Sequence, residues 1–232
     1  MNNFNFFGKN VVIVNGQNVS GGKNIKLKKF DERKSEDCSN IDKIKISSVL
    51  ANVNVSVCNS SAIEAHFYGE AQIDGDIEFN VKVLRQELII ILEIIGTCLT
   101  GKLNLDITIP QKVFKAISIT SSSGNINLNK GVSAKQINVS SMSGSLNLNA
   151  DVNDISAHTM SGDIAICIDA HQFVTTTIST MSGDVSATFN NIGHINLHTK
   201  TMSGTVKDNH KTDGCYSAYV EISTMSGNIR IR

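Results

Sequence analysis

The chain has 232 residues, with 21 basic and 21 acidic side chains, so its formal net charge is zero. This balance gives no long-range electrostatic reason to expect nucleic acid or an anionic membrane as a partner. Aromatic residues make up 5% of the chain and tryptophan is absent, which removes the stacking platforms common in proteins that bind single-stranded nucleic acid.

The chain begins MNNFNFFGKN, without a basic segment leading into an apolar one, so it does not predict a secretory signal. No apolar run has the length of a transmembrane helix. By default these features predict a cytoplasmic protein, and the true location stays open.

Residues 1–40 are expected to form a hairpin followed by a charged linker. Asn15-Gly16 lies between two alternating runs, and Asn-Gly is the strongest short-range signal for a β-hairpin. Residues 26–40 carry charges of both signs and lack apolar periodicity after Phe30. We interpret this segment as an exposed linker, and its mixed charges argue against a nucleic-acid arm.

Residues 41–110 predict irregular β coils. Residues 43–57 alternate between apolar and polar side chains, which is the period of a half-buried strand. Residues 88–95 are almost continuously apolar and suit a strand that is buried on both faces. Gly75 and Gly101 are each followed by alternating residues, and we interpret them as the corners of degenerate repeats.

Residues 111–232 follow Pro110, the only proline of the chain, and contain one short phrase six times. Four copies read Thr-Met-Ser-Gly and the first two read Ser-Ser-Ser-Gly and Ser-Met-Ser-Gly; a small polar residue and then Ile, Val or Leu follow, with alternating residues on both sides. Its period of about 20 residues predicts a solenoid. The corner glycines, identical in all six copies, are Gly124, Gly144, Gly162, Gly183, Gly204 and Gly227.

The phrase also predicts a bend within each copy. Counting in twos from Ile178 reaches Thr180, while counting back in twos from Val185 reaches Gly183 and Met181, so the alternation slips by one residue. A slip requires a bulge or bend, and glycine adopts the positive φ of such a bend without steric cost.

A coil of this length cannot bury its own apolar face, so neighbouring coils are expected to stack. The predicted fold is an all-β, single-stranded β-helix or β-solenoid with coils of about 20 residues and irregular N-terminal coils. Stacking aligns the five methionines other than Met1. An aligned methionine row can be a promiscuous binding surface, but we favour the interpretation that Met fills an irregular corner. The methionines are Met142, Met160, Met181, Met202 and Met225, preceded by Ser141, Thr159, Thr180, Thr201 and Thr224.

Candidate chemistry is sparse. The cysteines are odd in number, contain no C-x-x-C pair and predict neither a disulfide framework nor a zinc site. His158 would align with Ser179 and Lys200, so a histidine ladder for a metal is broken. We therefore predict no catalytic, metal-binding or cofactor-binding residues. The five cysteines are Cys38, Cys58, Cys98, Cys167 and Cys215.

Asp163 and Asp184 occupy the position after the corner glycine and could together bind a hard cation such as calcium. Other copies have Asn, Ser or Thr at this position. We therefore interpret the aspartates as examples of a general preference for small polar turn residues.

The repeated corners, preceded by the strand that ends in DITIP, resemble the DUF4097 family of bacterial putative adhesins from about Ile41 to Arg232. The resemblance implies a β-helical, adhesin-like protein of unestablished biochemical function, found in some members attached to the cell envelope. The family has no agreed catalytic residues to transfer to this chain.

Three function classes follow from these observations. We favour a non-catalytic interaction or structural module that offers ladders of Thr, Ser and Asn to a protein or envelope polymer. The alternative is a polysaccharide-binding or polysaccharide-processing β-helix, although Asp163, Asp184, Lys200 and Lys207 are dispersed in the repeat. An ice-binding surface is disfavoured, because the position two before Thr is mostly apolar.

The last repeat is followed only by residues 228–232. We expect this coil to lie uncapped at the end of the solenoid, where its open strand edge would be covered by a second copy of the chain or by further sequence.

Overall fold

The computed structural model describes residues 4–6, 9–13, 27–210 and 214–232. The hairpin expected at Asn15-Gly16 lies outside these residues. The all-β prediction is confirmed, since the described residues form strands and no helix. The strands are β1 (Phe4–Phe6), β2 (Lys9–Ile13), β3 (Leu27–Asp37), β4 (Lys43–Ser48), β5 (Asn52–Cys58), β6 (Ala62–Leu84), β7 (Glu87–Pro110), β8 (Val113–Ser123), β9 (Ile126–Ser143), β10 (Leu146–Ser161), β11 (Ile164–Asp169), β12 (Val174–Ser182), β13 (Val185–Asn190), β14 (Ile192–Ser203), β15 (Val206–Asp208), β16 (Tyr216–Ser226) and β17 (Ile229–Ile231).

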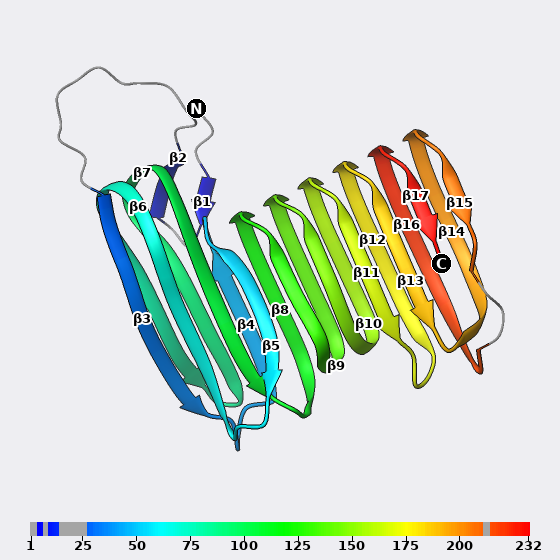
Figure 1. Ribbon diagram of the computed structural model, residues 1–232, viewed down its shortest axis with the longest axis horizontal. Coiled ribbons are helices and arrows are strands. Elements are labelled where there is room, and N and C mark those ends of the chain that lie inside the picture. Colours follow the sequence, from blue (N-terminus) through cyan, green and yellow to red (C-terminus); the bar gives the residue numbers. More distant parts are fainter. Residues whose placement is uncertain (1–3, 7–8, 14–26, 211–213) are drawn as a thin grey trace.

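The C-terminal half is a stack of parallel units, each consisting of a strand, a glycine corner and a second strand. Equivalent residues of neighbouring units pair in register, as Ile155 with Ile137 and Leu146 with Ile164. Figure 1 shows these strands side by side in a row from β8 to β14. The repeat period therefore becomes a ladder in which each residue lies about 4.8 Å from its counterpart.

The last two units do not follow chain order. The strand β16 pairs with β12 on one side and with β14 on the other, and β17 lies in the same way between β13 and β15. In Figure 1, β14 and β15 are outermost at the right end, with β16 inside them. The expectation of an uncapped C-terminal coil is therefore wrong, because the open edge belongs to β14 and β15.

The other end departs from chain order as well. The strands β4 and β5 lie between β7 on one side and β8 and β9 on the other. The long strands β6 and β7 form an antiparallel hairpin in which Gly75 pairs with Gly96. The segment around Gly75 is thus not a degenerate coil of the stack, and the protein is not a simple single-stranded β-helix.

The charged segment 26–40 contains the strand β3, which pairs antiparallel with β6 over its whole length. The prediction of a linker was wrong, although most of the side chains of β3 are exposed, as expected. An edge strand gains its order from backbone hydrogen bonds and can therefore carry charged side chains on its faces. Charges on an edge strand also disfavour pairing with other chains.

The core runs continuously through the stack. Most strands turn alternate residues inward, and these are mostly Ile, Val, Leu and Ala, whereas β15 is exposed throughout. Full burial of an Ile, Leu or Val side chain stabilises the fold by about 1.5–3 kcal/mol relative to its exposure. Residues 88–95 differ from prediction, because Leu88, Ile90 and Leu92 are buried while Ile89 and Ile91 are only half-buried. One face of that strand therefore packs in the core and the other is partly covered.

The corner glycines have φ values between 117° and 152°, a range that favours glycine. Each corner also lies directly on its neighbour. A Cβ atom at Gly183 would overlap the carbonyl oxygen of Gly162, and one at Gly162 would overlap that of Gly144. Two separate constraints, φ and close backbone approach, thus exclude a side chain at these positions.

Candidate functional site

The alternation of buried and exposed residues slips by one residue at Ser182-Gly183-Asp184. Thr180 and Val185 on either side of this segment are both buried, whereas Met181 is exposed. The threonine hydroxyls bond the backbone of the corner beside them: Thr180 Oγ1 donates to the Gly162 carbonyl oxygen at 3.3 Å. The threonine ladder is therefore internal and structural, and it does not offer hydroxyls to a polymer or to ice.

The residue after each corner glycine connects neighbouring units. The Asp184 N–H donates to Asp163 Oδ1 at 2.8 Å, and the Asn228 N–H donates to Asp184 Oδ1 at 2.7 Å. The bond from Asn228 holds the pKa of Asp184 below its ordinary value, and Arg230 adds a smaller effect in the same direction. Asp163 and Asp184 thus accept backbone hydrogen bonds within the stack.

The corner methionines form a row in which Met142 is half-buried and the other four are exposed, so the interpretation that Met fills the corner was wrong. Four of them line a shallow groove of about 670 Å³ together with serines only. Met202 lies beyond the groove, at the open end of the stack, and is 74% exposed. The groove residues are Ser122, Ser123, Met142, Ser143, Met160, Ser161, Met181, Ser182, Met225 and Ser226.

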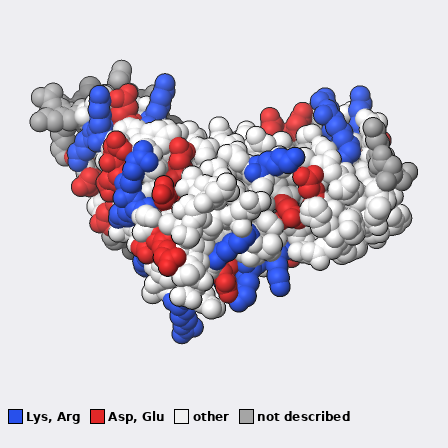
Figure 2. All heavy atoms as spheres, turned by 60° about the horizontal axis from the view of Figure 1, so that its bottom comes forward, with Lys and Arg blue, Asp and Glu red and all other residues white. Residues whose placement is uncertain are grey.

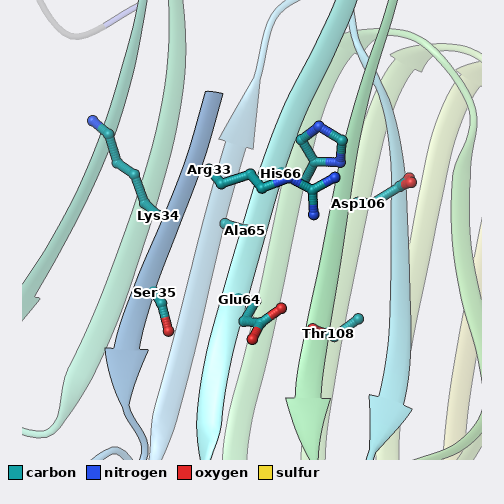
Figure 3. A pocket seen from close by; sticks show the side chains of 8 residues that line it. All are labelled: Arg33, Lys34, Ser35, Glu64, Ala65, His66, Asp106 and Thr108. Atoms are coloured by element: carbon teal, nitrogen blue, oxygen red, sulfur yellow. The ribbon is translucent and has the colours of Figure 1, made fainter. Parts of the chain in front are cut away.

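A second, polar groove of about 410 Å³ lies where β3, β6 and β7 run side by side. The register places Arg33 opposite His66, and His66 opposite Asp106. Figure 3 shows these side chains with Glu64 and Thr108 along the neighbouring strands. The groove thus combines basic, acidic and neutral hydrogen-bonding groups; its lining residues are Arg33, Lys34, Ser35, Glu64, Ala65, His66, Asp106 and Thr108.

Hydrogen bonds hold the floor of the polar groove in place. Asp106 accepts from the Tyr68 hydroxyl at 3.0 Å and from Asn54 Nδ2 at 2.7 Å, and Asn54 Oδ1 accepts from Asn127 at 2.8 Å. The bond to Asp106 raises the pKa of Tyr68, so its phenol stays protonated as the donor. The His66 ring stacks on Tyr68, with ring centroids 4.5 Å apart.

The His66 ring also has a partner on β3. Its Nε2 lies 2.7 Å from Asp31 Oδ1, and the two residues lie on paired strands. His66 therefore has contacts with a carboxylate and with an aromatic face. Its position in the groove is fixed before any ligand arrives.

Comparison with known proteins assigns the chain to a family. The family model described as Toastrack DUF4097 matches residues 41–232. The chain belongs to this family. No curated protein sequence matches the chain.

Several solved structures resemble this Toastrack protein. A putative cell adhesion protein from Clostridium sporogenes is 14% identical, with a TM-score of 0.52 over 88% of this chain and 99% of that one. A putative adhesin from Bacteroides fragilis is 15% identical, with a TM-score of 0.43 over 89% and 97%. A putative lipid binding protein from Parabacteroides distasonis is 11% identical, with a TM-score of 0.36 over 95% and 100%. At these identities the first structure supports the fold alone.

The remaining candidate residues of the Toastrack protein do not form a metal cluster. His158 Nδ1 lies 2.6 Å from Ser179 Oγ, as expected for ladder mates. Within the described ranges, His, Cys, Asp and Glu nowhere gather in a group of three or more that could hold a metal ion. All five cysteines are free thiols, and burial raises the pKa of Cys98.

Sequence reasoning missed the polar groove of the Toastrack protein. Its key residues, Arg33, His66 and Asp106, belong to three segments without a shared motif, and the antiparallel pairing of β3 and β6 was not predicted. The only signal was the alternation within residues 62–68, which places His66 and Tyr68 on one face of a strand.

Proposed function

We propose that this Toastrack protein is a non-catalytic, adhesin-like interaction module whose polar groove binds a carbohydrate polymer of the cell envelope. The observation that carries the proposal is the fixed arrangement around Asp106, in which Tyr68, His66 and Asn54 are held in place by one another. A few preorganised polar groups in a concave surface are typical of ligand sites.

The charges of the groove favour a polyhydroxylated ligand of low charge. Arg33, Glu64 and Asp106 all line the groove, so it has both signs, whereas the Lys34 ammonium donates to the Phe79 carbonyl oxygen. Figure 2 shows the same intermingling of basic and acidic side chains across the face that it displays. A strongly anionic or cationic polymer would meet repulsion as well as attraction on such a surface.

The same hydrogen bonds argue against an enzyme. Glycoside hydrolysis needs one carboxylic acid that donates a proton and a second carboxylate that acts on the sugar. The two Asp106 oxygens instead accept hydrogen bonds from the Tyr68 hydroxyl and from Asn54, so this carboxylate is a fixed acceptor within the fold. We therefore propose binding without turnover at this groove.

The parallel part of the chain is, within this proposal, a β-solenoid that holds the groove rigidly, and the partner is an envelope polymer or protein. We also retain the division into residues 1–40, 41–110 and 111–232 as a working description. It assigns the groove to the irregular first two parts and the exposed methionine row to the regular third part.

The experiment is sedimentation of the purified protein with insoluble envelope polysaccharides, with released sugar assayed in the supernatant. We expect retention without release. The double variant Arg33→Ala/His66→Ala should weaken retention by about tenfold, a loss of about 1.4 kcal/mol. Lys135→Ala, an exposed charge on β9, is the control and should leave retention unchanged.

Two results would reject the proposal. Sugar released into the supernatant would show that the protein cleaves the polysaccharide and is an enzyme. Equal retention of the wild type and the groove variant would show that any binding occurs elsewhere on the surface. A circular dichroism spectrum of each variant verifies that the loss of binding is not a loss of fold.

A further inference from the structure

The methionine row has a regular geometry that follows from the corners. Backbone hydrogen bonds join Gly144 to Ser161, Gly162 to Ser182 and Gly183 to Ser226, so the corners stack in one fixed order. In that order the methionines follow one another at steps of about 4.8 Å. The sequence of the row is Met142, Met160, Met181, Met225 and Met202.

The backbone under this row is anchored. Thr159, Thr180 and Thr224, each directly before a methionine, are buried, and their hydroxyls bond carbonyl oxygens of neighbouring corner glycines. The methionine side chains therefore start from fixed positions. Each methionine is unbranched and flexible, and two side-chain torsions place its sulfur, so neighbouring thioethers can converge on one point along the ladder.

The lining of the groove is chemically selective. It contains four thioethers and six serine hydroxyls and no charged side chain. Hard cations such as calcium and magnesium prefer carboxylate and free carbonyl oxygens. The lining residues include no carboxylate, and the carbonyl oxygens of Ser161, Ser182 and Ser226 already accept backbone hydrogen bonds. Thioethers are soft ligands and select soft metal ions, of which Cu(I) is the common biological example.

Packing does not explain the choice of methionine. Met160, Met181 and Met225 are 44–48% exposed, so their side chains are not filling the core. Leu or Ile would provide a similar apolar surface at the same positions. Of the six methionines in the chain, five nevertheless occupy this one structural position. The shared property is the sulfur atom.

We propose that the part of the methionine row that lines the groove is a binding site for a soft monovalent metal ion, Cu(I) or its analogue Ag(I), held by the thioethers of Met160, Met181 and Met225. Met181 is the central ligand, since it neighbours the other two. The site is separate from the polar groove and does not depend on carbohydrate binding.

The test uses the full chain with methionine labelled by ¹³C at its methyl group, and Ag(I) as a redox-inert probe. Cysteine thiols also bind Ag(I), so the background is Cys58→Ser/Cys167→Ser/Cys215→Ser, which removes the thiols that are not buried. We expect Ag(I) to shift the methyl signals of the three ligands. Anaerobic titration with Cu(I) should shift the same signals.

Two matched variants locate the site. Met181→Leu removes the central thioether and leaves two ligands, Met160 and Met225, whose backbones lie about 9.6 Å apart along the ladder. It should weaken Ag(I) binding by more than the roughly 10–100-fold that the loss of an outer-shell partner costs. Met202→Leu alters a methionine outside the groove and should leave the affinity unchanged.

Any of three outcomes would overturn the proposal: the methyl signals of Met160, Met181 and Met225 do not move with Ag(I), Met181→Leu binds Ag(I) as tightly as the unsubstituted background, or Met202→Leu loses as much affinity as Met181→Leu. The first outcome would leave the row as an apolar docking surface for another molecule. Both substitutions are at exposed positions, so we expect them to leave the melting temperature unchanged. This measurement separates the loss of a metal ligand from misfolding.

Discussion

Asp184 and Asn228 are 44 residues apart in the chain, yet the Asn228 N–H donates to Asp184 Oδ1 at 2.7 Å. This bond exists because β16 and β17 insert between two earlier units. The Thr205 N–H in turn donates to Asn228 Oδ1 at 3.1 Å, which places the unit of β14 and β15 outside the C-terminal one. The C-terminal strand is therefore an interior strand of the stack, and an earlier strand forms its edge.

Hydrogen exchange tests this order directly. Amides of β16 (Tyr216–Ser226) have neighbours on both sides, whereas β14 (Ile192–Ser203) pairs only with β16 among the described strands. Edge strands open at lower free energy than interior strands. We expect peptides from β16 to exchange more slowly than peptides from β14, measured by mass spectrometry. Faster exchange in β16, as in a terminal coil that frays, would contradict the insertion.

The Asp184 carboxylate makes stability depend on pH. Its pKa lies below the ordinary value of 3.8 because of the bonds from Asn228 and, to a smaller extent, Arg230. A carboxyl group with a lowered folded-state pKa stabilises the fold above its unfolded pKa, and this stabilisation is lost as pH falls through the folded pKa. We therefore expect the wild type to lose stability below about pH 4 partly through this group.

The variant Asp184→Asn isolates this contribution. Its amide oxygen can accept the same backbone bond, as Asn125 does from Ser145, but it does not titrate. We expect a smaller drop in melting temperature between pH 6 and pH 3 than in the wild type. Glu70→Gln, an exposed carboxylate on β6, is the control. Equal pH dependence in wild type and Asp184→Asn would refute the assignment.

The sequence predicts the interior of each unit well and the order of units poorly. The slip between Thr180 and Val185 can be read from the alternation alone, because burial follows a period of two on either side of the corner. The corners are nearly identical, so any of them can stack on any other with similar contacts. The sequence around Met225 or Met202 therefore does not indicate which unit is outermost.

The polar groove illustrates the same limit at the other end. Arg33 and His66 meet because β3 pairs antiparallel with β6, and the charged composition of residues 26–40 gave no strand signal. Backbone pairing with an existing sheet edge ordered this segment despite its composition. The orientation of the methionine row was also open, because Met181 is in phase with Val185 while its neighbour Thr180 is in phase with Ile178.

Two threonines on β12 provide a matched test of the internal hydroxyl ladder. Thr180 Oγ1 donates to the Gly162 carbonyl oxygen, whereas the buried Oγ1 of Thr176 has no hydrogen-bond partner among the described residues. A net hydrogen bond contributes about 1 kcal/mol, while a buried hydroxyl without a partner costs free energy. Thr180→Val should destabilise the protein by about 1 kcal/mol, and Thr176→Val should be neutral or stabilising. Urea unfolding measures both, and equal losses in the two variants would contradict the role of the hydroxyl.

The corner glycines allow a similar comparison. Gly183 and Gly131 both have positive φ, 150° and 97°, but only Gly183 lies on the backbone of its neighbour. At Gly131 the nearest atom to an added Cβ is Val57 Cγ2 at 3.7 Å, an ordinary contact. Gly131→Ala therefore incurs backbone strain alone, about 1 kcal/mol. Gly183→Ala adds a clash with the Gly162 carbonyl oxygen, which only displacement of two stacked corners can relieve. We expect it to lower the free energy of unfolding by about 3 kcal/mol or more.

Thermal unfolding of the two variants distinguishes the cost of the backbone strain from the cost of the clash. If the two alanines cost the same, positive φ alone would account for the glycine corners, and the close stacking of the units would add no constraint of its own.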